Sequence, residues 1–268
     1  MKNRIAVLGG SFNPPTIAHR RLLEAAVDAV DAGCGMFLPS AYWYVERKLK
    51  KQGRRQDALS DRLRLDMLKS MCETDGRLMV SALEINRAKT ERGYNYEGLL
   101  ALQRQYPESE IYFVAGSDKL HVIPRWHRIE EFVEHFKILV ASREEDDLEE
   151  IKRRAPFLKG HWDAFEVFSV PEEIGHISSS SFREMLRQND PAAQMLVTDG
   201  VWNILNEAGK IPWNTIGCFR EEYFYLSNFY ETQVTYGGFT YGSGEAAFQA
   251  QKCMTEEEKL PFTEAAPS

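Results

Sequence analysis

Short apolar runs bounded by glycine, proline or charged residues recur through the first half of the chain, and each has the pattern of a buried strand. We predict strands at Ile5–Leu8, Met36–Pro39, Met79–Ile85, Ile111–Ala115 and Lys137–Ala141. Apolar residues at consecutive positions, rather than at every second position, are typical of strands that are buried on both faces of a parallel sheet.

Between these runs, apolar residues recur at the three- and four-residue spacing of helices. The predicted helices contain Leu22 to Val30, Leu63 to Met71, Gly98 to Gln105 and Ala192 to Ala208. The charged stretch Glu46–Arg55 predicts a mobile loop, and the acidic run Glu144–Glu150 predicts a solvated loop or helix start.

Alternation of strands with helices predicts an α/β fold with a doubly wound parallel sheet and right-handed crossovers. Ligands of such sheets bind beyond the carboxyl ends of the strands. We therefore expect one crevice, rimmed by Gly9–Asn13, Pro39–Tyr44 and Gly116–Asp118.

The composition of the sequence changes after Gly209–Pro212, a plausible boundary. From Thr215 onwards aromatic residues and glycines are frequent. We predict two domains, residues 1–212 and a small α+β unit over residues 215–268. The 54 residues of the second unit are near the lower limit for a self-sufficient core, so the sequence predicts a partial domain.

Charge and cysteine content limit the class of protein. With 33 basic and 40 acidic residues the formal net charge is −7, which gives no general attraction to nucleic acid or to an anionic membrane. Cys34, Cys72, Cys218 and Cys253 form no C-x-x-C pair, so the sequence indicates neither a zinc site nor a disulfide framework. No signal-peptide pattern or membrane-spanning run is present, and we expect a cytoplasmic protein.

The segment Gly9–His19 lies between the first predicted strand and the first predicted helix. Its glycines allow the backbone to approach a phosphate, and the helix N-terminus offers free N–H groups. Thr16 and His19 share one face of the first helical turn and are expected to face a phosphoryl group. The phosphate cradle would be formed by Gly9, Gly10, Ser11, Phe12 and Asn13. On spacing alone, a tight turn with a capping threonine and a surface histidine explains the segment equally well.

A second candidate phosphate site is Ile177–Arg183, which contains four consecutive serines. Ser178 and Ser179 at a helix start would supply hydroxyl and N–H groups, and Arg183 would add charge-assisted bonds to phosphate oxygens. Alone, an ordinary serine-rich helix cap is the simpler explanation. Two anion sites in one chain favour phosphate binding.

Both segments resemble the signatures of the nucleotidyltransferase superfamily, in the form seen in nicotinamide or nicotinate mononucleotide adenylyltransferases. The first departs from the family's His/Thr-x-Gly-His ending only at Ala18. The second matches Ile-Ser-Ser-Thr-x-Ile-Arg with changes at Ser180 and Phe182. The resemblance covers about residues 4–210 and implies a Rossmann-like fold.

Further positions match the same family between the two signatures. Gly116 and Asp118 correspond to its Gly-x-Asp, which implies space for a nucleotide and a carboxylate for ribose hydroxyls. Trp126 stands where the family has a tryptophan near the pyridine ring, although a lone tryptophan is more often a core residue. Asn95, within Tyr94–Leu99, is expected to contact the mononucleotide.

Two features of the middle region are less well defined by the resemblance. Asn95 and Gly98 replace threonines of the family's Tyr-Thr-x-Asp-Thr-Leu, which leaves the choice of base open. The family places a lysine on the mononucleotide phosphate, and the resemblance assigns this role to Lys48 rather than to Lys50 or Lys51.

The resemblance implies transfer of AMP from ATP to nicotinamide or nicotinate mononucleotide, giving NAD or deamido-NAD and pyrophosphate. His19 would stabilise charge at the α-phosphate, and Ser178, Ser179 and Arg183 would hold pyrophosphate. Mg²⁺ would be carried by the ATP phosphates, with no metal site on the protein. Two alternatives stay open: a silent NAD- or ATP-sensing module that regulates the second unit, and an adenylyltransferase for another phosphorylated acceptor. The sequence leaves the base preference and a homo-oligomer undecided.

The second unit resembles the opening part of a NADAR-type N-glycosidase domain, in the segments Glu222–Tyr230 and Ser243–Lys252. The family's Glu-His-Ala becomes Glu245-Ala246-Ala247. Glu245 is therefore the candidate glycosidase carboxylate. Because its neighbour is changed and only the opening part of the family's sequence is matched, we expect no independent glycosidase activity.

Overall fold

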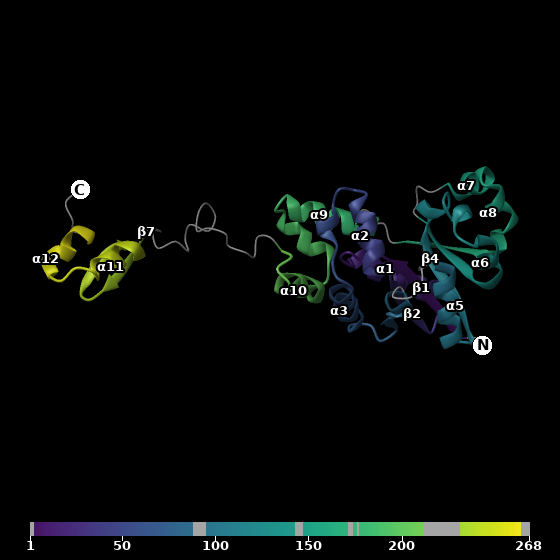
Figure 1. The fold of residues 1–268 in the computed structure, drawn as a ribbon, viewed down its shortest axis with the longest axis horizontal. Coiled ribbons are helices and arrows are strands. Elements are labelled where there is room, and N and C mark those ends of the chain that lie inside the picture. The colour runs from purple at the N-terminus through teal and green to yellow at the C-terminus, as the bar shows by residue number, and fades with distance from the viewer. Residues whose placement is uncertain are drawn as a thin grey trace. The chain divides into compact units, whose positions relative to one another are not determined.

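The structure is a computed structural model, and it describes residues 3–87, 95–142, 147–170, 174–175, 177–211 and 231–263. The chain divides into two compact units, Met1–Pro212 and Trp213–Ser268, and each is described by itself (Figure 1). The parts of the sequence analysis that concern Tyr94, Cys218, the acidic residues before Asp147 and the segment Glu222–Tyr230 lie outside the described residues.

The first unit is built on a six-stranded parallel sheet with the strand order β3-β2-β1-β4-β5-β6. Its strands are β1 Asn3–Gly10, β2 Cys34–Pro39, β3 Leu78–Val80, β4 Ser109–Gly116, β5 Lys137–Ser142 and β6 Phe165–Ser169. Val7 of β1 pairs with Met36 of β2 on one side and with Phe113 of β4 on the other. The predicted doubly wound parallel sheet is confirmed, and β1 is flanked by β2 and β4 at the point where the strand order reverses.

Helices connect the strands and cover the sheet (Figure 1). They are α1 Ile17–Ala29, α2 Tyr42–Lys50, α3 Asp61–Cys72, α4 Leu83–Arg87, α5 Asn95–Gln105, α6 Ile129–His135, α7 Leu148–Arg154, α8 Pro156–Gly160, α9 Ser179–Arg187 and α10 Asp199–Glu207. On one face, Ile5 and Val7 of β1 pack with Leu99 of α5 and Phe132 of α6. A Cβ atom at Gly35 of β2 would lie 2.8 Å from side-chain atoms of α1, so glycine allows α1 to lie close to the sheet.

Some element predictions were wrong. Residues 42–50 form α2, although Glu46–Arg55 was predicted to be a loop, because Val45 and Leu49 recur at helical spacing and are buried. The predicted strand Met79–Ile85 is only β3, which is followed by α4. The predicted helix Ala192–Ala208 is interrupted, because Thr198 caps a separate α10.

Strand β6 has no counterpart in the sequence prediction. It lies at the sheet edge, and only Phe165 and Phe168 of its five residues are buried. The expectation of continuous apolar runs therefore overlooked it, because these two residues are separated by two exposed ones.

The second unit contains a β-hairpin and two short helices. Strands β7 Glu231–Tyr236 and β8 Phe239–Ser243 are antiparallel, and Gly237 and Gly238 connect them with φ of 62° and 86°. Positive φ at both turn positions favours glycine. Helices α11 Gly244–Ala250 and α12 Glu256–Lys259 follow, and Tyr241, Ala247 and Ala250 form a small core.

Candidate active site

The turn between β1 and α1 is packed tightly against aromatic side chains. A Cβ atom at Gly9 would lie 3.1 Å from the Phe113 ring, and one at Gly10 would lie 3.1 Å from the Phe12 ring. Phe12 is buried and its ring contacts the His19 ring edge-on, with a centroid distance of 5.1 Å. The two glycines therefore let the backbone lie close to the Phe113 and Phe12 rings, and the Phe12 ring supports His19. The Phe12 side chain is thus a packing group.

Thr16 and His19 form a reciprocal capping box at the start of α1. The Thr16 backbone N–H donates to Nδ1 of His19 at 3.0 Å, and Thr16 Oγ1 lies 2.7 Å from the same nitrogen. A backbone N–H can only donate, so Nδ1 carries no proton and the neutral ring carries its proton on Nε2. The hydrogen bond thus fixes a tautomer in which Nε2 is free to donate to a phosphate oxygen.

His19 is neutral in the free protein. Burial and, to a smaller extent, the charge of Lys48 lower the pKa of His19 to about 4. Near neutral pH the side chain is therefore a hydrogen-bond donor without a positive charge. The positive charge of the site comes from its lysines and arginines.

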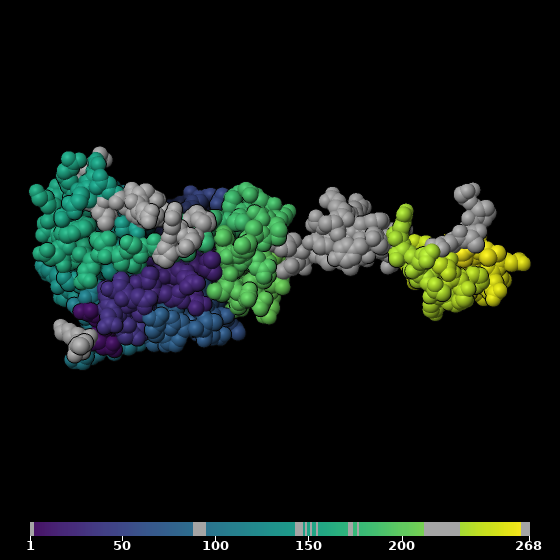
Figure 2. Space-filling view, turned by 180° about the vertical axis from the view of Figure 1, so that it is seen from behind, coloured from purple at the N-terminus to yellow at the C-terminus, as the bar shows by residue number. Residues whose placement is uncertain are grey.

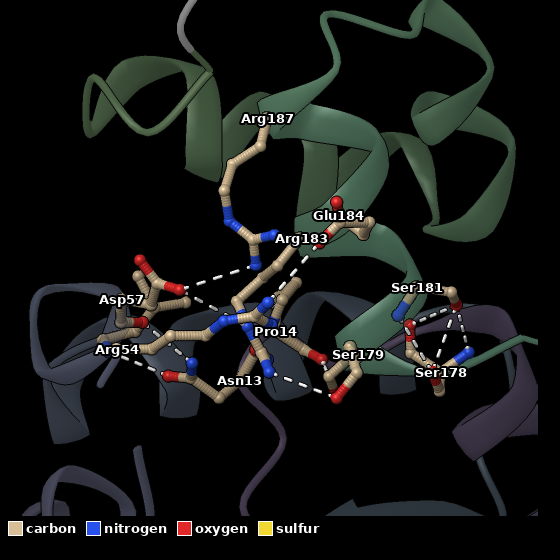
Figure 3. A network of polar contacts seen from close by, with 12 residues as sticks. Asn13, Pro14, Arg54, Asp57, Ser178, Ser179, Ser181, Arg183, Glu184 and Arg187 are labelled. Carbon is tan, nitrogen blue, oxygen red and sulfur yellow. Dashed lines mark hydrogen bonds and ion pairs between the residues drawn. The ribbon is translucent and has the colours of Figure 1, made fainter. Parts of the chain in front are cut away.

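The second serine-rich segment docks on the turn after β1. Ser179 donates from Oγ to the Pro14 carbonyl at 2.7 Å, and Arg183 donates to the Asn13 carbonyl (Figure 3). Ser178 is the N-cap of α9, and its hydroxyl accepts from the Ser181 N–H at 3.0 Å. Helices α9 and α10, coloured green, lie beside the N-terminal residues in Figure 2. The structure thus joins the two predicted phosphate segments, which are more than 160 positions apart in the sequence.

Asn13 and Asp57 extend this junction to the loop before α3. The Asn13 side chain donates to the Asp57 carbonyl and accepts from the Leu59 N–H, both at 2.8 Å. Asp57 Oδ2 lies 3.9 Å from Arg183 Nε and 3.7 Å from Arg187 Nη2 (Figure 3). The buried Asn13 side chain therefore holds the loop before α3 against the turn after β1.

A cavity of about 530 Å³ opens at the carboxyl ends of β1, β2 and β4. The predicted site residues that line it are Gly9, Gly10, Ser11, Lys48, Asn95, Gly116 and Trp126. The predicted residues that do not line it are Phe12, Asn13, Thr16, His19, Asp118, Ser178, Ser179 and Arg183. Lys48 does line it, and the charge of Lys48 is close enough to lower the pKa of His19, as the charge of Arg183 is to lower the pKa of Lys48.

Cations gather beside the turn. Burial lowers the pKa of Lys48, and the nearby charges of Lys119 and Arg183 lower it further. Such mutual repulsion shows that three like charges are held close together, an arrangement that phosphate oxygens would relieve. Lys48 lies on α2 and not on the predicted loop. Lys50 and Lys51 do not line the cavity.

The predicted ribose-binding and ring-binding residues differ in their partners. Asp118 is exposed and forms an ion pair with Lys119. A Cβ atom at Gly116 would lie 2.4 Å from Asp118 Oδ1. Trp126 is half-buried, and its ring packs edge-on against Phe113 and Phe132 with centroid distances of 5.7 Å. Trp126 is thus both a packing residue and part of the cavity wall.

The sequence analysis overlooked Arg64. Its side chain is fully buried and donates to the Ser11 carbonyl at 2.8 Å and to the Ser40 carbonyl at 2.6 Å. It also pairs with Asp61 at 2.6 Å. The guanidinium thereby fixes the turns that follow β1 and β2 relative to each other. Its position on the apolar face of α3 was the only available signal.

The cavity wall also contains Glu84 and Trp43, which the sequence analysis did not single out.

Within the described part of the chain, no group of three or more His, Cys, Asp or Glu side chains could hold a metal ion. Among the described residues, no helix is long and apolar enough to cross a membrane.

Glu245 lies in the second unit, in the first turn of α11. Its Oε1 accepts a hydrogen bond from Gln249 Nε2 at 2.5 Å. The two residues are one helical turn apart, so this is a local contact within α11.

Residues 7–185 match the Cytidylyltransferase-like family. A probable nicotinate-nucleotide adenylyltransferase of Carboxydothermus hydrogenoformans is 29% identical over 193 residues, which cover 72% of this chain and 90% of that protein. A protein of the same description from Geobacillus thermodenitrificans is 26% identical over 206 residues, 77% of this chain and 85% of the relative.

Solved structures share the fold of the first unit. Plasmodium falciparum nicotinic acid mononucleotide adenylyltransferase complexed with APC has a TM-score of 0.61 and 19% identity, over 77% of this chain and 96% of that chain. The same enzyme complexed with NaAD has a TM-score of 0.59 and 18% identity over the same shares. At this level of identity the likeness concerns the fold.

Proposed function

The chain belongs to the cytidylyltransferase-like family, and from this we propose that it transfers the adenylyl group of ATP to nicotinate or nicotinamide mononucleotide in NAD biosynthesis. The curated relatives named above, described as nicotinate-nucleotide adenylyltransferases, support this reaction. A 5′-phosphate oxygen of the mononucleotide attacks the α-phosphorus of ATP. The bond from this phosphorus to the β-phosphate oxygen breaks, and pyrophosphate leaves with the bonding electron pair.

One observation carries the proposal: both phosphate segments meet at the carboxyl ends of the central strands, where Ser179 and Arg183 contact Pro14 and Asn13. The α-phosphate would lie at the start of α1, where N–H groups and the helix dipole favour an anion. His19 would donate from Nε2 to an α-phosphate oxygen, and Thr16 would hold the ring in that tautomer. Such catalysis depends on position and charge rather than on a covalent intermediate.

The other polar and charged residues would bind either the leaving pyrophosphate or the acceptor mononucleotide. Ser178, Ser179 and Arg183 would hold the departing pyrophosphate, and Lys48 would bind the mononucleotide phosphate. Asp118 would accept from ribose hydroxyls, and Trp126 would contact the pyridine ring. Mg²⁺ would enter with ATP, because the described side chains offer no cluster of metal ligands.

The test is release of pyrophosphate from MgATP with each mononucleotide as the sole acceptor. We expect release with at least one, and we expect His19→Ala to lower kcat at least a hundredfold while circular dichroism shows an intact fold. Binding of the mononucleotides without release would favour the sensing module. Release with only another phosphorylated acceptor would favour the other alternative.

For the second unit, the NADAR-type resemblance is a proposal that rests on Glu245 and its neighbours in the sequence. We expect the full chain to release no free base from an N-ribosylated base, and Glu245→Gln to leave adenylyl transfer unchanged. Base release that disappears in Glu245→Gln would contradict this and would assign a second activity to the unit. We further propose a cytoplasmic location, in agreement with the expectation from the sequence.

A further inference from the structure

The first unit contains a second cavity, of about 370 Å³, beside helix α9. Its wall is formed by the turn after β1, the loop before α3, α9 itself and the C-terminal end of α10. None of its described lining residues lines the cavity at the carboxyl ends of β1, β2 and β4. The reaction proposed above gives a ligand-binding role to only one of these lining residues, Arg183. The second cavity is therefore a separate place for which the reaction gives no ligand.

Much of the wall of this second cavity is apolar. Leu186 follows Phe182 by one turn of α9, so both lie on the same face of this helix. The apolar lining residues are Pro14, Leu59, Phe182, Leu186 and Leu205. Cavities that bind small molecules measure roughly 300–1,000 Å³ and have mostly apolar walls with a few polar groups. The second cavity therefore has the size and the lining to hold the hydrocarbon part of a small molecule.

The charged side chains of the same wall carry an excess of positive charge. They are Arg183 and Arg187 of α9, Lys210 after α10, and one acid, Asp57. Asp57 Oδ2 lies 3.9 Å from Arg183 Nε and 3.7 Å from Arg187 Nη2 (Figure 3). These distances are too long for hydrogen bonds. A single carboxylate thus balances the charge of three cations only in part.

Arg187 has N–H groups to offer to a ligand. Its Nη1 donates to Glu184, whereas its Nη2 has only the long contact with Asp57. A guanidinium carries five N–H donors in a flat fork that matches the two oxygens of a carboxylate. Arg187 is exposed in the described part of the chain, as is Lys210, so both can be reached from solvent.

The helix ends favour an anion of low charge. Helix α9 ends at Arg187 and α10 ends at Glu207, just before Lys210. The carbonyl groups at a helix C-terminus attract cations and disfavour anions. Basic residues at such ends can serve the helix alone, but here they stand beside an apolar cavity. A carboxylate brings one negative charge next to these carbonyls and to Asp57, whereas a phosphate would bring up to two.

We propose that the second cavity binds a small carboxylate with an apolar body. Arg187 and Lys210 hold the carboxylate group, and the apolar body packs on Leu186 and Leu205. This site is distinct from the one proposed for ATP and the mononucleotide. The inference therefore goes beyond the proposed adenylyl transfer and does not depend on it.

The experiment measures binding to the full-length chain by calorimetry. The probes are butanoate, hexanoate and octanoate, with hexanamide as the neutral counterpart of hexanoate. We expect the affinity to rise about fourfold for each added CH₂ group, because each group leaves water for the apolar wall. Hexanamide should bind at least tenfold more weakly than hexanoate, because it lacks the charge that the arginine attracts.

Substitutions show where the carboxylate binds. Arg187→Gln keeps a good helix former at an exposed position, so it should fold, and it should weaken hexanoate binding at least tenfold. Lys210→Gln lies beyond the end of α10 and should weaken it severalfold, which tests the proposal independently of any change in α9. Lys48→Gln is the matched control, since it removes one cation from the other cavity, and it should leave the Kd for hexanoate unchanged.

Several results would overturn the proposal. They are an affinity that does not rise with chain length, equal binding of hexanamide and hexanoate, or tighter binding of inorganic phosphate than of hexanoate through Arg187. A loss in Lys48→Gln equal to that in Arg187→Gln would place the carboxylate in the other cavity and would also overturn it. Calorimetry with these probes involves no turnover. Binding of hexanoate as expected, without pyrophosphate release from MgATP, would therefore retain this site and reject the adenylyl transfer.

Discussion

His19 is set up as a hydrogen-bond donor by the residue that caps its own helix. Nδ1 is occupied by the Thr16 N–H, and burial keeps the ring neutral by lowering its pKa. A neutral donor stabilises negative charge on a phosphate oxygen without repelling Lys48. The sequence spacing predicted that Thr16 and His19 share a face. It could not predict the tautomer, because the rotamer of the ring and its burial arise from packing against Phe12.

The low pKa of His19 predicts a dependence of stability on pH. The unfolded chain binds a proton at His19 near the ordinary pKa of 6.5, whereas the folded chain does so only near 4. The free energy of unfolding should therefore contain a contribution that is complete above 6.5 and is lost as the pH falls from 6.5 to 4. Denaturant titrations should show this contribution, on the order of 3 kcal/mol, and His19→Gln should lack it. Equal pH profiles would contradict the buried neutral state.

Arg64 predicts a large loss of stability from a single change. Arg64→Met keeps much of the length of the side chain but leaves the Ser11 and Ser40 carbonyls and the Asp61 carboxylate without their donor. We expect a loss of about 3 kcal/mol, measured by urea unfolding. Arg64→Lys keeps the charge but lacks the planar fork, so it should recover only part of this loss. A full recovery would show that charge alone matters.

At the scale of elements, helix α9 is a separate piece that must dock on the turn after β1. Its N-terminal serine caps the helix, the next serine holds the Pro14 carbonyl, and Arg183 reaches Asn13 one turn later. The order of residues in this segment therefore follows from the need to begin α9 and to attach it to the turn after β1.

Removal of the α9 cap should affect both stability and ATP binding. Ser178→Ala should lower the free energy of unfolding by about 1 kcal/mol and raise the KM for ATP several-fold, because the first turn of α9, where we propose that pyrophosphate binds, loosens. Thr198→Ala removes the corresponding cap of α10, which has a Thr198 Oγ1 to Val201 N distance of 3.4 Å. It should cost similar stability and leave the KM unchanged. An equal rise in both variants would show a general effect of destabilisation.

The elements that the sequence predicted best were those with the most uniform surroundings. Strands β1, β2, β4 and β5 are buried on both faces, so their apolar runs are continuous and easily recognised. Helix α2 was overlooked because charged residues surround its two buried positions, Val45 and Leu49. Edge strand β6 was overlooked because its two buried residues, Phe165 and Phe168, are separated by two exposed ones.

At the scale of the whole chain, the overall charge opposes the proposed substrates, which are polyanions. The formal net charge is −7, yet α2 and the residues after it carry Arg47, Lys48, Lys50 and Lys51 next to the cavity. A hollow lined by Tyr44, Arg47, Lys48 and Lys51 adjoins the cavity at its shared residues Tyr44 and Lys48. Local cations can guide anions to a site on a protein of the same net sign.

Lys51→Glu should therefore slow the encounter with substrate without changing the chemistry. We expect kcat/KM to fall about threefold to tenfold at low ionic strength, kcat to stay unchanged, and the difference to shrink as salt is added. Lys69→Glu on α3 changes the net charge by the same amount away from the cavity and should have little effect. A salt-independent loss in Lys51→Glu would indicate direct contact with substrate instead.

The candidate site was predictable where it depends on neighbours in the sequence and unpredictable where it depends on long-range contact. The turn Gly9–Ser11 and the pair Thr16 and His19 are local motifs. Arg64 acts through residues brought close only by folding, such as Ser11 and Ser40. A single sequence contains no record of such pairs.

The hydrogen bond from the Thr16 backbone to His19 has one more consequence. Because the capping residue's own amide selects the tautomer, winding of the first turn of α1 and readiness of the imidazole are a single event. If this turn frayed, the Thr16 N–H would no longer bind Nδ1, and the His19 ring could carry its proton on Nδ1 instead of on Nε2. The side chain of His19 is therefore ready to donate from Nε2 only while the first turn of α1 is folded and the Thr16 N–H is bonded to Nδ1.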